Sequence, residues 1–420
     1  MSGLTTIAAT APPPPQATGP RVVLVTGKGG VGKSTTAAAL AVDSARSGQR
    51  TLLMSTDAAH SVGDVLATPV VTSAHFADTV VVDGLLEAQA VGARTEVGAD
   101  WGVIQGWLLT ILAGLDVDPV VADELTALPG AEDIAALLAL AAHVEQGHYD
   151  VIVVDCAPTA ETLRLLALPE LLAWHLERLL PAQRRLLTVL RPAAVQAAGV
   201  APPSAEVLAV IQEWRTRMTS VRDILTSPQT SVRIVLTPER MVLAEARRLH
   251  TSLALHGYAV DGIVVNRIFP NDGDAWRAAW SQAQHDGMQH VLASFPDLPV
   301  TAVPYAAAEP IGMAALASLW ADRTLVAGAH HDLLEPVPHH NLRVHADGDD
   351  FVLRLAVPHT RSPDVGVVRR DDDLVVSVGM DRRVLALPSV LRRCTVQTAS
   401  VGHGELKVRF VRNAQEWPRG

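Results

Sequence analysis

Short runs of β-branched and aliphatic residues alternate along the chain with longer segments whose apolar residues recur at helical spacing. The short runs lie at 21–26, 50–55, 149–155, 232–237 and 262–266. The run at 149–155 includes four consecutive β-branched apolar residues, which is typical of a strand covered on both faces. Because helical segments separate the runs, the pattern predicts a mostly parallel, doubly wound α/β sheet.

Two helical stretches are longer than the connections in such a sheet require. They span about 100–146 and 161–226, are rich in Leu and Ala, and are broken mainly at Pro. A crossover between parallel strands needs only about a dozen residues. The excess therefore predicts a helical subdomain, which is either a lid or a binding element.

From about residue 341 the apolar period changes to two. Alternating segments at 351–357, 373–378, 383–387 and 405–410 are separated by turn residues, which predicts an all-β sandwich. The expected division of the chain is a disordered tail at 1–20, the α/β domain with helical inserts at 21–328, a linker at 329–340 and the sandwich at 341–412. The charge balance changes at the same place. Residues 341–412 carry 12 Lys and Arg against 9 Asp and Glu, whereas residues 1–340 carry 21 against 34.

The composition excludes several classes of function. A net charge of −10 argues against a nucleic-acid partner, since phosphate neutralisation needs clustered Lys and Arg. The two cysteines, Cys156 and Cys394, form no C-x-x-C pair, so neither a disulfide framework nor a zinc or iron–sulfur site is expected. The tail at 1–20 does not resemble a signal peptide, and the apolar stretch at 101–115 is too short to span a membrane. We therefore expect a cytoplasmic protein without a transmembrane segment.

A glycine-rich loop follows the first predicted strand and opens a helix. It has the Walker A pattern, in which Gly27 is followed after four residues by Gly32-Lys33-Ser34. In such a loop the backbone N–H groups face a phosphate, Lys33 reaches the β and γ phosphates, and the Ser34 hydroxyl binds Mg²⁺. The predicted ATP-binding residues of the loop are Gly27, Lys28, Gly29, Gly30, Val31, Gly32, Lys33, Ser34 and Thr35.

Lys28 is the unusual residue of this loop. The chain has only three lysines, and Lys28 and Lys33 are two of them. The sequence Gly-Lys-Gly-Gly-x-Gly-Lys-Ser resembles the deviant Walker A loop of nitrogenase iron protein, the chromosome-partitioning and Min ATPases, and the ArsA/Get ATPases. The resemblance implies a homodimer in which Lys28 reaches the nucleotide of the partner subunit and acts in trans, as an arginine finger does.

Asp57 follows the second predicted strand and is the candidate general base. A carboxylate at the C-terminal end of such a strand, beside the nucleotide, can orient or deprotonate the attacking water. The alternative is a helix-capping Asp without a catalytic role. The segment from Asp57 resembles switch I of the ArsA/Get branch, Asp-Pro-Ala-His-Ser, with Ala58 in place of Pro.

Asp155 ends the buried strand at 149–155 and is placed as a Walker B residue. It is expected to hold Mg²⁺ directly or through water. The segment that follows resembles switch II of the same branch, with Cys156 in place of Thr and with Ala160 and Glu161 in place of Gly-His. Cys156 is expected to be a small buried residue.

Three later positions match the family less specifically. Asn266 ends the strand at 262–266 and matches the asparagine that reads adenine, since an amide offers a donor and an acceptor to a purine edge. Pro304 and Tyr305 resemble the loop that closes on the base, and Pro238-Glu239 matches a further position. Each of these also fits an ordinary loop.

The resemblance covers about 21–320 and favours the ArsA/Get branch over its relatives. The chain lacks the cysteines of iron–sulfur members, a C-terminal amphipathic membrane helix of the Min type, and a basic face suited to partitioning. The segment at 341–412 resembles the α-crystallin domain of small heat-shock proteins, which some ArsA/Get proteins carry at this place.

The resemblance leaves the client of such an ATPase open. Arsenite prefers several thiolates, and the zinc-bridged dimer of eukaryotic Get ATPases needs C-x-x-C, so this chain supplies neither. A tail-anchor chaperone would cover an apolar protein helix with a Leu-rich helical groove, although the same helices also fit a filled subdomain. The leading hypothesis is a Mg²⁺-dependent ATPase whose homodimer handles a hydrophobic protein segment. The alternatives are an ATP-gated interaction protein with incidental turnover, and a subunit of an anion pump.

Overall fold

The computed structural model describes the chain at 19–56, 61–70, 72–73, 78–91, 97–114, 118–119, 131–156, 204–270, 274–329, 333–337, 342–348 and 350–413. Asp57 and the segment at 157–203, which includes Ala160 and Glu161, lie outside the described residues.

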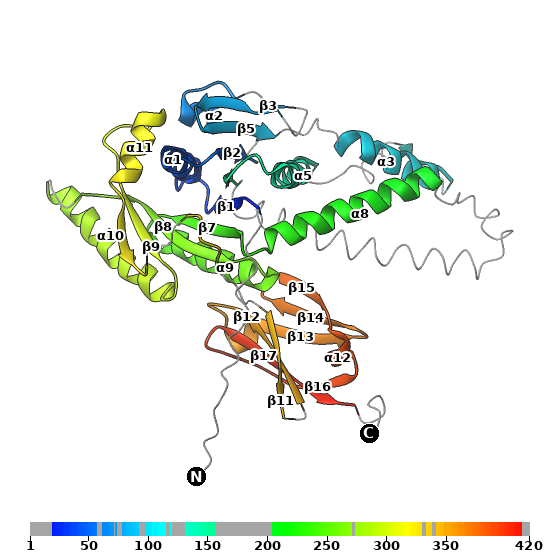
Figure 1. Ribbon diagram of the computed structural model, residues 1–420. Coiled ribbons are helices and arrows are strands. Elements are labelled where there is room, and N and C mark those ends of the chain that lie inside the picture. Colours follow the sequence, from blue (N-terminus) through cyan, green and yellow to red (C-terminus); the bar gives the residue numbers. More distant parts are fainter. Residues whose placement is uncertain are drawn as a thin grey trace, which may run out of the picture.

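A mixed sheet forms the centre of the larger part of the molecule (Figure 1). Among the described residues, ten strands belong to it, in the order β10-β9-β8-β7-β1-β6-β2-β5-β3, with β4 paired to β5. They are β1 (Arg21–Thr26), β2 (Thr51–Ser55), β3 (Thr72–Ser73), β4 (Val80–Asp83), β5 (Leu86–Val91), β6 (Val151–Asp155), β7 (Thr230–Leu236), β8 (Val260–Ile268), β9 (Val300–Pro304) and β10 (Thr324–Ala327). All neighbours are parallel except β4 with β5 and β10 with β9.

Helices cover both faces of this sheet. On one face lie α1 (Lys33–Arg46), α2 (Ser61–Leu66) and α11 (Met313–Ala321), and on the other α5 (Ala131–Gln146), α8 (Ala205–Leu225), α9 (Arg240–His256) and α10 (Ala275–Ser294). Side chains alternate along β1, so Val22 and Leu24 enter one apolar core while Val23 and Val25 enter the other. The strand is buried on both faces, and the predicted doubly wound α/β class is confirmed.

β5 is a strand that the apolar pattern does not predict, because polar residues occupy its alternate positions. Both of these polar residues, Glu87 and Gln89, form hydrogen bonds. Glu87 accepts from the Tyr149 hydroxyl at 2.7 Å, and the side chain of Gln89 bonds His143 Nε2 at 2.9 Å. Burial and the contact with Glu87 raise the pKa of Tyr149 to about 12, and burial lowers that of His143. These partners lie far along the chain, so local pattern cannot reveal the strand.

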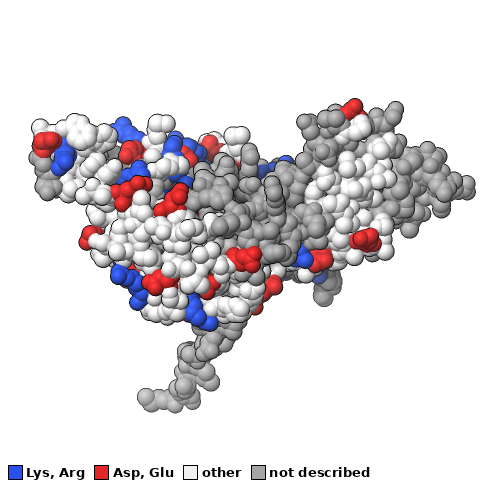
Figure 2. Space-filling view, turned by 90° about the horizontal axis from the view of Figure 1, so that it is seen from above, with Lys and Arg blue, Asp and Glu red and all other residues white. Residues whose placement is uncertain are grey.

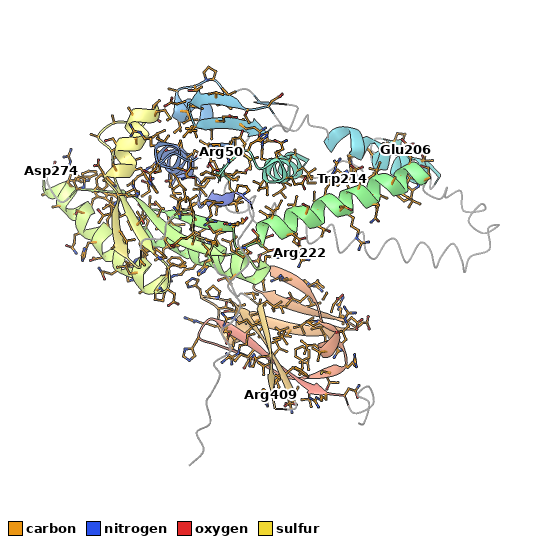
Figure 3. All side chains as sticks on the ribbon, in the orientation of Figure 1. Arg50, Glu206, Trp214, Arg222, Asp274 and Arg409 are labelled. Atoms are coloured by element: carbon orange, nitrogen blue, oxygen red, sulfur yellow. The ribbon has the colours of Figure 1, made fainter. Side chains whose placement is uncertain are left out.

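A helical arm extends from the sheet on one side (Figure 1). It consists, in the described part, of α3 (Val97–Gly114) and most of α8, which begins at the N-cap Ser204, whose hydroxyl accepts from the N–H of Val207. Trp101 of α3 and Trp214 of α8 pack with their ring centroids 6.0 Å apart, and Trp214 points from α8 toward the other helices (Figure 3). Within the described residues, neither these helices nor any other combines the length and hydrophobicity that a membrane crossing needs.

The C-terminal segment forms two antiparallel sheets around a separate core. Their strands are β11 (Leu342–Asp347), β12 (Asp350–Ala356), β13 (Val365–Arg370), β14 (Asp373–Val378), β15 (Asp381–Ala386), β16 (Cys394–Gly402) and β17 (Glu405–Arg412), with the short helices η1 (Ser362–Asp364) and α12 (Ser389–Arg392). The described strands pair as β11-β12-β17-β16 and β13-β14-β15. Leu353, Val376 and Phe410 are buried between them, which confirms the predicted all-β sandwich.

The sandwich is docked on the C-terminal half of α9. Leu255 of α9 is fully buried in the apolar core of the sandwich. Arg383 of β15 donates to the Leu255 carbonyl at 2.6 Å, and the Thr251 hydroxyl of α9 donates to the Pro358 carbonyl. The two parts of the chain therefore share a hydrogen-bonded and apolar contact rather than a bare linker.

Two histidines at this contact predict a dependence of stability on pH. His250 of α9 and His359 are hydrogen-bonded at 3.1 Å, and both rings pack on Phe295. Burial lowers the pKa of His250 from 6.5 to about 3, with a further contribution from the charge of His359. Burial likewise lowers the pKa of His359 to about 4, and Arg247 adds to the effect. In the folded state, both imidazole rings therefore favour the neutral form.

Stability is therefore expected to be full above pH 6.5 and to fall as the pH is lowered from there toward 3, because unfolding then takes up protons. For His250 the loss amounts to roughly 1 kcal/mol one pH unit below its unfolded pKa. Denaturant unfolding of the wild type and of His250→Leu, which cannot titrate, measures it. Equal acid sensitivity of the two proteins would contradict the prediction.

Candidate functional site

The glycine-rich loop occupies the edge of the sheet where β1 ends. Gly27, Gly30 and Gly32 have φ angles of 155°, 81° and 94°, which residues with a side chain rarely adopt. A Cβ on Gly27 would lie 2.1 Å from the Val235 carbonyl oxygen, and one on Gly32 would lie 2.2 Å from Asn266 Nδ2. The backbone path of the loop therefore requires glycine at these positions.

The loop opens α1 without closing the end of the helix. Gly32 is the N-cap residue, so no side chain caps the helix, and the first turn has no acidic residue. The first N–H groups of a helix lack intrahelical acceptors and carry its positive dipole. Lys33, at the first helical position, is 8% exposed. This combination of N–H groups at the start of a helix and one ammonium group is suited to bind a phosphate.

Substitution of Gly27 is expected to damage the loop even without a ligand. Gly27→Ala forces a methyl group against the backbone of β7, which should cost about 2 kcal/mol or more in the free energy of unfolding. Gly29→Ala is the matched control, because a Cβ at Gly29 meets nothing within 4 Å. Its expected change is within about 0.5 kcal/mol. Thermal or denaturant unfolding compares the two, and equal stability of both variants would show that the loop path is adjustable.

Asp155 lies beside this loop at the end of β6. It pairs in register with Val25 of β1 and with Ser55 of β2, and it is completely buried. The Cys156 thiol next to it is buried as predicted, and its pKa is raised by burial and by the charge of Asp155, while the charge of Lys33 opposes the rise. Lys33 and Asp155 therefore act electrostatically on the same point. Although Asp57 lies outside the described residues, the strand that precedes it ends next to Asp155.

Lys28 makes an ion pair within its own chain. Its ammonium nitrogen lies 3.0 Å from Glu245 Oε2 of α9, and the side chains are 39% and 26% exposed. Glu245 is not among the residues predicted for the site, although it is the one acidic residue of α9. Its importance depends on the turn from β7 into α9, which brings the second turn of the helix over the glycine loop.

Asn266 lies against the glycine loop. Its Nδ2 donates to the Val31 carbonyl at 2.9 Å, and its Oδ1 accepts from the Arg267 N–H at 2.9 Å. The side chain is buried. In this structure the amide therefore braces the glycine loop, and its predicted contact with adenine stays a prediction.

Pro304 and Tyr305 lie at the same edge as Asn266. Pro304 pairs with Ile268 of β8, and the Tyr305 N–H donates to the Ile268 carbonyl at 2.8 Å. The Tyr305 ring is 50% exposed and stacks on Phe269, with centroids 5.1 Å apart and planes at 7°. Pro238 and Glu239 lie between β7 and α9, and Glu239 is the N-cap residue of α9. The structure thus brings the glycine loop, Asp155, Asn266 and Tyr305 to one edge of the sheet.

The donor set at this edge fits a nucleotide with a divalent cation. The uncapped helix end and Lys33 suit phosphate oxygens, while the Ser34 hydroxyl and the Asp155 carboxylate are oxygen ligands of the kind that Mg²⁺ prefers. The half-exposed Tyr305 ring, at the end of the strand that pairs with the strand of Asn266, suits a base. The arrangement can therefore hold a nucleoside triphosphate along the edge, with the base toward β8 and β9 and the phosphates at β1.

Comparison with known proteins agrees with this geometry. Residues 20–323 match the model of the anion-transporting ATPase family, and residues 348–410 match the HSP20-like domain found in ArsA. The chain is 36% identical to protein Rv2184c of Mycobacterium tuberculosis, covering 95% of this chain and 97% of that protein. It is 28% identical to the putative arsenical pump-driving ATPase 1 of Aquifex aeolicus, covering 92% and 99%. It is 30% identical to an ATPase ASNA1 homolog of Trypanosoma cruzi, covering 59% and 74%.

Proposed function

Since the chain belongs to the anion-transporting ATPase (ArsA) family and carries the HSP20-like domain of that family, we propose that it is a Mg²⁺-dependent ATPase whose homodimer handles hydrophobic protein segments. The observation that carries the proposal is the glycine loop, with its uncapped helix and buried Lys33, next to the buried Asp155.

We infer the roles of the described residues from their positions and the role of Asp57 from the sequence alone. Lys33 and the N–H groups of α1 hold the phosphates, and Ser34 and Asp155 hold Mg²⁺, which neutralises charge on the phosphate oxygens. Asp57 orients the attacking water. Asn266 keeps the loop in shape through Val31, and Tyr305 lies where a base would stack.

The homodimer is proposed because Lys28 is otherwise redundant. Lys33 already supplies the buried cation of the loop, whereas Lys28 is partly exposed and points away to Glu245. A second subunit that approaches this edge would give Lys28 a phosphate to bind. The exchange of a carboxylate for a phosphate partner favours the closed dimer only when nucleotide is present.

The helical arm supports the hydrophobic client. α3 has a single acidic residue and no basic one among its 18 residues. Seen from above, the described surface over α3 and α8 is largely free of Lys, Arg, Asp and Glu (Figure 2). Among the described residues of the arm, Ile104, Val207 and Ile211 form a small buried cluster, and Trp101 and Trp107 are half-buried. An apolar protein helix would cover such a surface.

The arm gives a direct test of client binding. A fluorescent peptide with an apolar helix of about 20 residues is expected to bind the full chain, with affinity that differs between ATP and ADP. Trp107→Asp should weaken this binding about tenfold or more, because it places a charge on the apolar surface. Val81→Asp is the matched control, since Val81 is 66% exposed on β4, outside the arm. Unchanged binding by Trp107→Asp would reject the arm as the client site.

Asp57→Asn separates this proposal from its rival, an ATP-gated interaction protein with incidental turnover. In a working ATPase cycle the variant binds ATP but cannot release the client. In the rival the variant handles client as the wild type does. An arsenite pump is disfavoured, because Cys156 and Cys394 are both buried and soft arsenic needs several accessible thiolates.

A further inference from the structure

A polar cavity of about 720 Å³, which we call the back cavity, lies at the edge of the large sheet opposite the glycine loop. The C-terminal half of α1, strands β7 and β8, the end of α11 and the segment at 333–335 form its walls. No step proposed for ATP hydrolysis uses this edge, because the loop, Asp155 and Asn266 all lie at the other ends of the strands.

The floor of the cavity is an ionic cluster inside an otherwise apolar sheet. Arg233 is the one charged residue of β7 and donates to both carboxylate oxygens of Asp261, at 3.1 and 2.8 Å. The same carboxylate accepts from Arg21 at 3.2 Å and from the Ser231 hydroxyl at 2.8 Å. Arg21 and Asp261 have side chains only 3% and 2% exposed.

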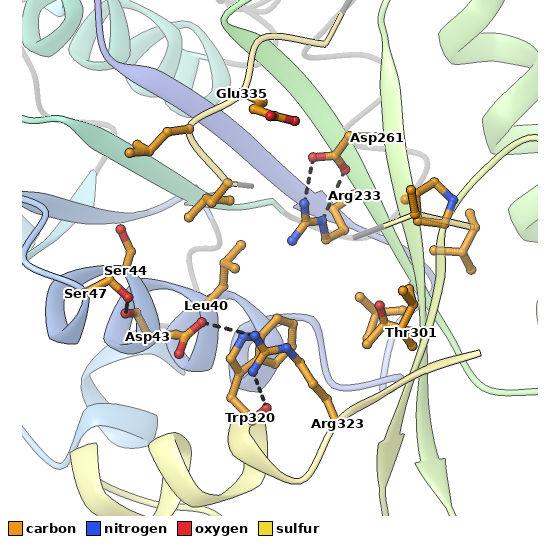
Figure 4. Close-up of a pocket in the computed structure, with 18 of the residues that line it drawn as sticks. Leu40, Asp43, Ser44, Ser47, Arg233, Asp261, Thr301, Trp320, Arg323 and Glu335 are labelled. Atoms are coloured by element: carbon orange, nitrogen blue, oxygen red, sulfur yellow. Dashed lines mark hydrogen bonds and ion pairs between the residues drawn. The ribbon is translucent and has the colours of Figure 1, made fainter. Parts of the chain in front are cut away.

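This cluster has one positive charge more than it has negative charges. Two guanidinium groups share a single carboxylate. Burial lowers the pKa of Arg21 to about 10 despite the opposing charge of Asp261, and repulsion by Arg233 adds to the lowering. Buried charge without a counterion is costly. Arg233 remains 16% exposed, and its nitrogen that does not contact Asp261 points into the open centre of the cavity (Figure 4). The surplus positive charge therefore faces any ligand that enters the cavity.

A second guanidinium group and an aromatic ring face Arg233 across the cavity (Figure 4). Arg323 lies over the Trp320 ring at 4.9 Å and reaches Asp43 of α1 only at 3.5 Å, a long ion pair. Trp320 is 3% exposed, and within the described residues its Nε1–H has no hydrogen-bond acceptor. Among the described residues of the lining, Glu335 is the remaining acid, but it is exposed, so water screens its charge far more than that of the buried cluster.

We propose that this cavity binds a small anion bearing carboxylate or phosphate groups, held by Arg233 on the floor and Arg323 on the opposite wall. Arg233 can donate to such an oxygen through the nitrogen that does not contact Asp261, and Arg323 can do so in exchange for its long contact with Asp43. The wall at 333–335 belongs to the connection between the ATPase and HSP20-like parts, and Arg21 fixes it by donating to the Leu333 carbonyl at 3.0 Å. The anion thus binds between the ATPase core and this connection.

The test is calorimetric titration of the full chain with inorganic phosphate and, separately, with succinate, in a buffer free of both. Phosphate also binds glycine loops, so each titration is repeated on Lys33→Ala, whose back cavity is intact. The wild type and Lys33→Ala should both bind at the cavity, and Arg233→Gln should bind about tenfold more weakly or worse. Binding of phosphate alone identifies phosphorylated ligands, and binding of succinate alone identifies carboxylates.

Arg233→Gln is a fair variant, because it leaves Arg21 and Asp261 as a neutral pair. If it fails to fold, Arg323→Gln on the other wall replaces it and should also lose binding. Arg217→Gln, on the exposed surface of α8, is the matched control and should bind as the wild type does. The absence of binding of either anion, or wild-type binding by both cavity variants, would overturn the proposal.

Discussion

Lys33→Ala is expected to lower the rate of ATP hydrolysis about 100-fold or more while leaving the fold intact. Lys33 is the buried cation at the start of α1. Its charge and that of Asp155 both act on the Cys156 thiol, in opposite directions. Charge that develops on the transferred phosphoryl group would lose its fixed positive partner in a site shielded from water. Phosphate release at saturating ATP and Mg²⁺ measures the effect.

The chain supplies a matched control for this substitution. Lys407→Ala removes the only lysine outside the glycine loop, on β17 of the sandwich, where it contacts Glu405 at 3.7 Å. It should hydrolyse ATP at the wild-type rate. A Lys33→Ala protein with unchanged melting temperature and undiminished hydrolysis would disprove the assignment of the site.

Lys28→Ala is expected to abolish turnover while it preserves ATP binding. A cation supplied in trans at this kind of site contributes about 10³-fold or more to the rate of phosphoryl transfer. In the single chain Lys28 contacts Glu245 instead, so the loop around Lys33 does not depend on it. ATP affinity, measured by titration, should change little, whereas phosphate release should fall to background.

Mixing two inactive variants decides whether Lys28 acts across a dimer. In a mixed dimer of Lys28→Ala and Lys33→Ala, one site would combine the intact Lys33 of one subunit with the intact Lys28 of the other. Partial activity should therefore return on mixing. If Lys28 acts within its own subunit, no site in the mixture is complete, and the absence of activity would reject the trans mechanism.

Glu245→Gln should act in the opposite sense and weakly. The pair with Lys28 is partly exposed, and such pairs contribute about 0.2 to 1 kcal/mol, which is at most about fivefold in an equilibrium. The release of Lys28 should lower the protein concentration at which turnover becomes half-maximal by no more than this factor.

The chemistry of the site was predictable where it depends on local sequence. The glycine loop could be predicted because Gly27 and Gly32 hold backbone conformations that other residues avoid, and β6 because its apolar run ends at Asp155. The α/β class followed from the alternation of short apolar runs with helical segments, and the sandwich followed from the change of apolar period near residue 341. In each case the signal lies within one element and its flanking turns.

Contacts between distant segments were not predictable in this way. Glu245 pairs with Lys28 only because α9 crosses the loop, and Asn266 is engaged with Val31 through the pairing of β7 with β8 and with β1. The floor of the back cavity joins Arg21 to Asp261, which is 240 residues away. Single residues of these kinds carry no pattern that periodicity can detect. The limits of the domains and the role of Asp57 stay predictions.

Leu255 couples the stability of the sandwich to that of the ATPase part. This side chain belongs by sequence to α9, between two strands of the ATPase sheet, yet it completes the apolar core of the HSP20-like part. A chain cut after residue 328 would leave Leu255 facing water at a cost of about 1.5 to 3 kcal/mol, and the separated sandwich would have a cavity of the same size. The two segments that match separate family models are therefore expected to melt together, in one cooperative transition.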